Sequence, residues 1–208
     1  MAYDLEEQEQ LDEFKAWWKK NGSMATNVVL AALIGFAAWQ GYHYFQNKKA
    51  VEASTLYQNL VTTDIAKTAD IKAQSAKLME DFASTPYAGR AAVYAAKTNA
   101  AANDSKSAKS QLAWAIKNAK EGAVQAIASI QLAGILLDEK NYDEAQKVLS
   151  ANTDKGFEGL KEDLKGDILM AQGKNAEAKK AFESALENLD AQGRMHQYTQ
   201  QKLESLGV

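Results

Sequence analysis

The sequence predicts an all-α chain in which one membrane-spanning helix precedes a domain of repeated helical hairpins. A run without charged side chains covers residues 24–45. The 208 residues contain a single proline, Pro86, and abundant alanine, a composition typical of helices that are rarely interrupted. A pattern of small and apolar residues recurs with a step of 33 residues in the C-terminal half. Together these observations predict an N-terminal amphipathic helix, one transmembrane helix and a superhelix of helical hairpins.

The stretch Met24–Phe45 is long and apolar enough to cross a membrane. Its 22 residues contain no Asp, Glu, Lys or Arg. A helix of that length reaches about 33 Å, whereas the hydrocarbon layer is about 30 Å thick. Trp17 and Trp18 precede the stretch and Trp39 lies near its end, where aromatic rings favour the headgroup region. A buried core helix and the apolar part of a cleaved signal sequence are the alternatives, but the leader is too long and too acidic for a signal peptide.

The predicted boundaries are a leader at 1–23, a transmembrane helix at 24–45 and a folded domain at 46–208. In the leader, Phe14, Trp17 and other apolar residues fall close to one helical face. We expect Asn21 and Gly22 to end this helix. Such a helix lies on the membrane surface or docks on a partner membrane protein.

Lysines on the two flanks of the anchor predict its orientation. Three stand before it and two after it: Lys15, Lys19 and Lys20, then Lys48 and Lys49. The excess on the leader side favours a cytoplasmic N-terminus, because basic residues are enriched on the cytoplasmic side of membrane helices.

Small residues recur four positions apart within the expected span. They form two pairs, Ala31 with Gly35 and Ala37 with Gly41. Such pairs permit the close approach of another membrane helix, and plain exposure to lipid is the alternative interpretation.

Composition limits the functions open to the remaining residues. The absence of cysteine excludes disulfides, thiolate metal sites and thiol catalysis. Basic and acidic residues are nearly balanced and no basic cluster is present, so nucleic acid is not an expected partner. His43 and His196 lack the neighbours of a nucleophilic site, and no glycine-rich phosphate loop is present. We expect no enzymatic activity, no metal and no cofactor.

The helical hairpins of the C-terminal half repeat. Residues 136–149 match residues 169–182, and each copy places a tight polar turn between two helices with a small residue where the helices cross. In the second copy Gly166 and Phe182 take the positions of a small residue and an aromatic partner. This arrangement resembles the tetratricopeptide repeat. A looser copy lies 37 residues ahead of the first, with a longer polar turn at Ala100–Lys106.

Some positions depart from the repeat pattern. Glu162 and Lys165 stand where the first helix of a repeat is usually apolar. Unrelated helical hairpins in a bundle are therefore the alternative architecture. Divergent copies still stack, because each hairpin buries its apolar face on its neighbours.

The order of these features resembles the ancillary Sec translocon subunit family, the YfgM-like proteins of Gram-negative bacteria. The leader ends with FKAWWKKNG at residues 14–22, one anchor follows, and the repeat domain contains PYA at 86–88 and LKGD at 164–167. The resemblance implies a single-pass inner-membrane protein with a cytoplasmic N-terminus and a periplasmic domain. It also implies association with SecYEG and with the anchored periplasmic chaperone PpiD, and a chaperone or adaptor role for secreted and outer-membrane client proteins.

A repeat superhelix presents the first helices of successive repeats on its concave side. The candidate groove residues on these helices are Arg90, Val93 and Lys97, then Ile127, Ile130 and Leu137, then Leu160, Asp163, Asp167 and Met170. An apolar middle between basic and acidic ends suits an extended or partly folded segment, which would be held by burial of apolar surface. The alternative is that the two isoleucines and Leu137 only pack against neighbouring helices.

Two other functions fit the same architecture. One is a scaffold whose groove binds a single folded partner without chaperone activity, which a test for suppression of aggregation would distinguish. The other is a regulatory adaptor that sequesters a signalling protein through the acidic leader. Deletion of residues 1–20 would abolish that function and leave the first two largely intact.

Overall fold

The computed structural model describes residues 2–151 and 154–207, which form helices joined by short turns and include no strand. The elements are α1 (Ala2–Thr62), α2 (Thr68–Asp81), α3 (Pro86–Ala101), α4 (Ser105–Asn118), α5 (Gly122–Asp138), α6 (Tyr142–Ser150), the 3-10 helix η1 (Lys155–Phe157), α7 (Glu158–Ala171), α8 (Asn175–Asn188) and α9 (Arg194–Ser205). The predicted all-α fold is confirmed. The chain divides into two compact units, Met1–Lys48 and Lys49–Val208.

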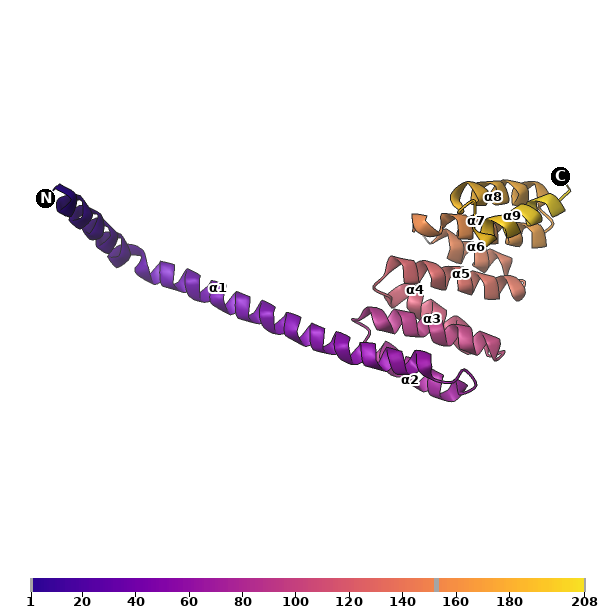
Figure 1. Cartoon of the computed structure of the whole chain (residues 1–208), viewed down its shortest axis with the longest axis horizontal. Coiled ribbons are helices and arrows are strands. Elements are labelled where there is room, and N and C mark those ends of the chain that lie inside the picture. Colours follow the sequence, from indigo (N-terminus) through magenta and orange to yellow (C-terminus); the bar gives the residue numbers. More distant parts are fainter. Residues whose placement is uncertain (1, 152–153, 208) are drawn as a thin grey trace. The chain divides into compact units, whose positions relative to one another are not determined.

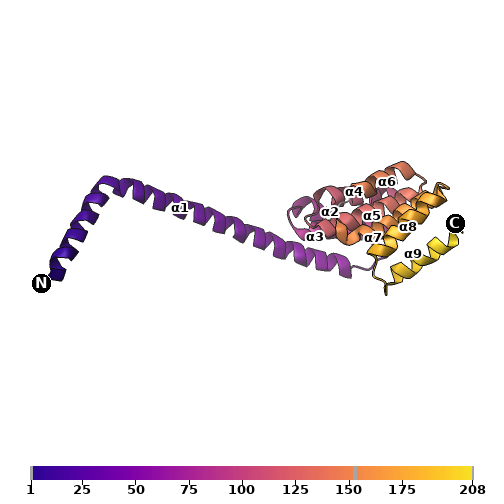
Figure 2. The same ribbon diagram turned by 90° about the horizontal axis from the view of Figure 1, so that it is seen from above.

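The first unit consists of the N-terminal part of α1, and the expected helix end at Asn21 and Gly22 is wrong. Gly22 does not take the positive φ that terminates a helix, and α1 continues through it. The Asn21 amide donates to the Trp17 carbonyl (3.2 Å), and the Thr26 hydroxyl donates to the Gly22 carbonyl (2.8 Å). Both polar side chains therefore bond to the helix itself. Hydroxyl bonds of this kind bend helices, and Figure 2 shows a bend in this part of α1.

The apolar side chains of the first unit are exposed. Leu33, Ile34 and Phe36 are 59%, 68% and 62% accessible. Only 6% of the most apolar window of α1 is buried against protein, and the helix is long and apolar enough to cross a membrane. Nearer the N-terminus, Phe14 stacks on Trp17 and Trp18 with ring centroids 6.4 and 6.1 Å away, which confirms that these residues share a face.

The second unit is a stack of helical hairpins. It begins with the end of α1, which pairs with α2 and buries Leu60 beside Ile71 and Leu78. The next hairpins are α3 with α4, α5 with α6 and α7 with α8, and α9 follows. Figure 1 shows α2 to α7 following one another through the stack from magenta to orange, with α8 and α9 together at its end. In Figure 2, α4 and α6 lie in one layer and α3, α5 and α7 in the other.

The turns between paired helices repeat in their backbone geometry. Asn103, Lys140 and Gly173 have φ values of 61°, 61° and 75° at equivalent positions. In each turn the residue after this one donates its backbone N–H to a carbonyl five residues earlier, at 2.8 to 2.9 Å. The expected longer turn at Ala100–Lys106 is wrong, since this turn matches the other two. The wider spacing of that copy comes mainly from α5, which has 17 residues whereas α7 has 14.

Small residues allow the helices of each hairpin to approach closely. A Cβ on Gly166 of α7 would overlap the Phe182 ring of α8, so the expected pairing of these two residues is confirmed. Phe182 is fully buried in a cluster with Leu169 and Ala178, against which Leu203 of α9 packs. A larger cluster, dominated by alanine and leucine, joins α3, α4, α5 and α6 and includes Ile168 of α7. These clusters make the second unit a continuous repeat domain.

Candidate protein-binding groove

A pocket of about 250 Å³ opens among the first helices of the first three hairpins. Four of the predicted groove residues line it, namely Arg90, Val93, Lys97 and Ile127, together with Tyr57, Tyr94 and Val124. The structure therefore brings together side chains from α1, α3 and α5. This position is where the repeat pattern placed the concave surface.

Three of the lining residues were not predicted from the sequence. Tyr94 lies one turn after Arg90 on α3, and Val124 lies one turn before Ile127 on α5. Helical spacing from the predicted residues would have identified these two. Tyr57 lies on α1, ahead of the residues that the recurring hairpin pattern covers, so no register linked Tyr57 to the groove.

An ion pair fixes one end of the pocket. The Arg90 guanidinium donates to both carboxylate oxygens of Glu121, with Nε to Oε2 at 2.8 Å and Nη2 to Oε1 at 2.6 Å. It also lies 5.8 Å from the centre of the Tyr87 ring, which in turn packs 5.7 Å from the ring of Tyr57. The hydrogen bonds from Arg90 lower the pKa of Glu121 and raise that of Arg90, so both stay charged and neutralise each other.

The other polar groups of the pocket differ in charge. Burial raises the pKa of the Tyr57 phenol, which is therefore neutral. Lys97 lies on α3 about two turns beyond Arg90 and is exposed. No carboxylate pairs with Lys97 in the part of the chain that the structure describes, and none lines this pocket. The pocket thus combines apolar walls with one uncompensated ammonium group.

Ile130 and Leu137 do not line this pocket. Both are half-buried and pack against the central cluster of α3 to α6. These contacts agree with the packing interpretation for Ile130 and Leu137, whose part in binding stays a prediction, whereas Ile127 lines the pocket.

The expected acidic end of the groove needs correction, because α9 covers it. The Thr199 hydroxyl donates to Asp163 at 2.7 Å, and the Lys202 ammonium donates to Asp163 at 2.8 Å and to Asp167 at 2.7 Å. Asp163 is only 5% exposed. Burial acts to lower the pKa of Lys202, but its bonds to the two carboxylates outweigh burial and raise it. Asp163 and Asp167 therefore hold the last helix in place.

The remaining two residues of the predicted groove differ in exposure. Leu160 is half-buried, and Met170 is 39% exposed on α7. Met170 is therefore accessible to a partner.

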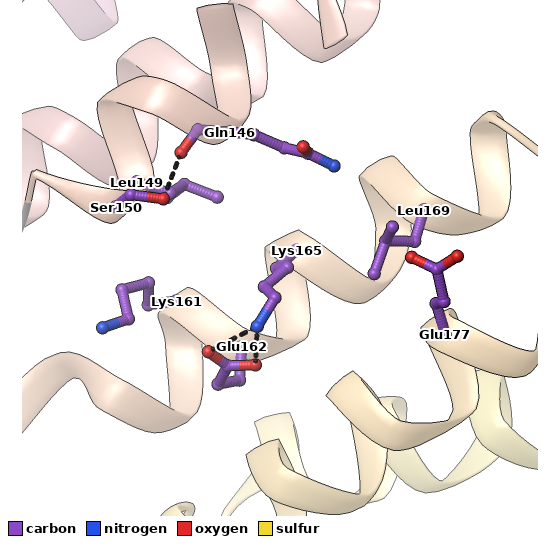
Figure 3. A pocket seen from close by; sticks show the side chains of 8 residues that line it. All are labelled: Gln146, Leu149, Ser150, Lys161, Glu162, Lys165, Leu169 and Glu177. Atoms are coloured by element: carbon purple, nitrogen blue, oxygen red, sulfur yellow. Dashed lines mark hydrogen bonds and ion pairs between the residues drawn. The ribbon is translucent and has the colours of Figure 1, made fainter. Parts of the chain in front are cut away.

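A second pocket, of about 260 Å³, lies between α6 and the pair α7 and α8 (Figure 3). The positions that depart from the repeat pattern, Glu162 and Lys165, line it. Lys165 donates to both carboxylate oxygens of Glu162, at 3.1 and 2.9 Å, and Lys161 pairs with Glu158 at 2.6 Å. Each of these two lysines is therefore paired within α7, and the exposed Glu177 of α8 also lines the pocket.

The small residues of the expected span have open surroundings. A Cβ added to Gly35 or Gly41 would meet nothing within 4 Å, and Ala31 and Ala37 are exposed. Contact of this stripe with another membrane helix stays a prediction. Among the described residues, no group of three or more His, Asp or Glu side chains is placed to hold a metal ion.

Comparison with known proteins gives matches along nearly the whole chain. A family model described as a tetratricopeptide repeat-like domain matches residues 15–208. The ancillary SecYEG translocon subunit of Neisseria gonorrhoeae is 33% identical over 211 residues, covering 99% of this chain and 100% of that protein. Proteins with the same name from Haemophilus influenzae and Escherichia coli K12 are 27% and 26% identical, covering 89% and 97% of this chain and 91% and 97% of their own lengths.

Proposed function

This chain belongs to the family of ancillary SecYEG translocon subunits, and we propose that its repeat domain binds polypeptides beside the Sec translocon. The proposed binding site is the pocket of α1, α3 and α5 that Tyr57, Val93 and Ile127 help to line. The observation that carries this proposal is the pocket itself, formed by successive first helices of a tetratricopeptide-like array. Apolar walls from Val93, Val124 and Ile127 would stabilise a bound side chain by about 25 cal/mol per Å² of apolar surface removed from water.

The proposed topology rests on α1. Its exposed apolar stretch at 24–45 would span the inner membrane, with residues 1–23 in the cytoplasm and 46–208 in the periplasm. The lysines on the leader side support this orientation. The stacked Phe14, Trp17 and Trp18 rings would lie at the cytoplasmic headgroups.

The proposed partners follow from the family and from the anchor. SecYEG is the partner that the relatives' name gives. A PpiD-like anchored chaperone and secreted or outer-membrane clients are the further partners that the resemblance implies. An anchored groove needs only weak affinity, because tethering to the same membrane raises the local concentration to the order of mM.

Site-specific photocrosslinking during secretion tests the proposal. We expect a photoreactive residue at Ile127 to crosslink to secreted chains or to a translocon partner, and one at Met170 to do so more weakly. The matched control is Ala113, which is exposed on α4 in the other layer of helices. Equal crosslinking from Ile127 and Ala113 would contradict a binding function of the groove.

The topology has its own test. A reporter that is active only in the periplasm, fused after residue 208, is expected to be active. The same reporter fused before residue 1 is expected to be inactive. Activity at the N-terminus alone would overturn the proposed orientation.

A further inference from the structure

The pocket of α1, α3 and α5 has a charge that its own residues do not neutralise. Arg90 is held by Glu121 in two hydrogen bonds, so this pair contributes no net charge. Lys97 is exposed at the pocket without a carboxylate partner among the described residues. The net charge that a ligand meets at the pocket is therefore positive.

The uncharged part of the pocket suits a large apolar side chain. Val93, Val124 and Ile127 supply aliphatic surface, and Tyr57 and Tyr94 supply aromatic rings. Aromatic ligands pack on such rings in offset or edge-on arrangements that add to the gain from burial. The volume of about 250 Å³ is open to solvent on the groove side and admits one side chain of a passing segment.

We infer that the pocket selects extended polypeptide segments in which an aromatic residue is followed or preceded, within two positions, by Asp or Glu. This inference rests on the proposed function and names the ligand class of the same site. Val93 and Tyr94 lie three or four residues before Lys97 on α3, which corresponds to about 5 Å along the helix. An extended chain advances about 3.3 Å per residue, so a carboxylate one or two residues from the anchored ring reaches the Lys97 ammonium.

The same geometry disfavours basic segments. The Arg90 guanidinium and the Glu121 carboxylate are bonded to each other. No carboxylate lines the pocket that could pair with a lysine or arginine of the ligand. A basic residue beside the aromatic ring would stand close to Lys97 and be repelled. Because Lys97 is exposed, salt would weaken both effects.

A binding experiment with the full-length protein in lipid nanodiscs tests this inference. Two fluorescent peptides of glycine and serine each carry one tryptophan, with aspartate two residues later in one and lysine in the other. Anisotropy at low salt is expected to show about fivefold tighter binding of the aspartate peptide, the scale of one exposed ion pair. The preference is expected to disappear in Lys97→Gln.

The matched control is Lys117→Gln, which removes an exposed lysine of α4 outside the pocket and is expected to keep the preference. Equal binding of the two peptides to the unmodified protein would overturn the inference and leave the proposed groove function standing. A preference that persists in Lys97→Gln would also overturn it. Binding of neither peptide, together with equal crosslinking from Ile127 and Ala113, would overturn both.

Discussion

Two of the chain's apolar helical stretches have opposite surroundings. The stretch at 24–45 of α1 exposes its large side chains, with Ile34 68% accessible. Helix α5 is also rich in apolar residues, yet Ala128, Ala133 and Leu136 are buried by the neighbouring hairpins. Both stretches lack charged side chains, apart from Asp138 at the end of α5.

The difference shows that apolar composition alone does not decide where a helix resides. Length distinguishes the two stretches, because the 17 residues of α5 reach only about 26 Å. Small residues are the second distinction. In α5 alanines lie at the contacts with neighbouring helices, whereas Ala31 and Ala37 of the α1 stretch are exposed. An arginine placed in each stretch should therefore disrupt different properties.

The largest effect is expected in α5. Ala133→Arg would place an unpaired charge at a fully buried position in the central cluster. We expect the repeat domain to lose about 4 kcal/mol or more of unfolding free energy, since a buried charge without a partner is among the most destabilising substitutions. Urea unfolding followed by circular dichroism measures this loss. The control, Ala113→Arg on the exposed side of α4, is expected to stay within about 0.5 kcal/mol.

The corresponding substitution in α1 is expected to affect membrane insertion. Ile34→Arg places a charge near the middle of the apolar stretch, at a cost of about 3 kcal/mol for insertion. More of the protein should then be extracted from membranes by alkaline carbonate, whereas the thermal unfolding of the repeat domain should not change. Ile34→Leu is the control and should remain in the membrane. A lower unfolding temperature in Ile34→Arg would show that the side chain packs on protein.

A third substitution compares α5 with α7 at a glycine. Gly166→Ala is expected to destabilise the last hairpin by about 1 to 3 kcal/mol, because the new Cβ overlaps the Phe182 ring. The same change at Gly134 of α5 meets no atom within 4 Å and should stabilise the domain by up to about 1 kcal/mol through helix propensity. Denaturant midpoints of the two variants give the comparison.

A double variant separates overlap from other causes. Gly166→Ala combined with Phe182→Leu should cost less unfolding free energy than the sum of the two single substitutions, because the smaller side chain removes the overlapping ring atoms. If the two substitutions simply add, the contact between α7 and α8 is not the origin of the effect.

Local patterns predicted most of the architecture. The charge-free run is contiguous, and the 33-residue step and the positions of Gly166 and Phe182 follow from comparing one helical hairpin with the next. The family that these patterns indicated is confirmed by relatives along nearly the whole chain. Four groove residues were also predicted to lie together, because the register of the repeat places them on equivalent helices.

The failures involve interactions that local patterns do not contain. The capping of Asp163 and Asp167 by α9 joins residues 35 to 39 positions apart, and α9 is polar on average, so its sequence does not show which residues of α7 it bonds to. At Gly22 the sequence suggested a helix end, but the chain on both sides is helical and the adjacent side chains bond to the same helix. The low helix propensity of Gly22 was therefore overridden by the helical residues on both sides of it.

The smallest expected effect on stability comes from the ion pair between Glu121, at the start of α5, and Arg90 of α3. Glu121 precedes α5 and bonds to Arg90 of α3, which lowers the pKa of Glu121 below its ordinary value of 4.5. A carboxyl whose pKa is lowered by folding contributes stability above its unfolded pKa and loses it as the pH falls through the folded pKa. Glu121→Gln is therefore expected to lower the unfolding temperature slightly near pH 7. The gap to the unmodified protein should close as the pH falls below about 4.5.

Thermal unfolding by circular dichroism between pH 7 and pH 3 measures this gap. Asp104, whose pKa is lowered by its hydrogen bonds with Ser107, titrates in both proteins, so its contribution cancels in the difference. Glu183→Gln, at an exposed position of α8, serves as the matched control and should give no gap. If the difference in unfolding temperature persists undiminished at pH 3, Glu121 stabilises the start of α5 by packing and not by its charge. Helix α5 would then need no ion pair, as the α1 stretch needs none.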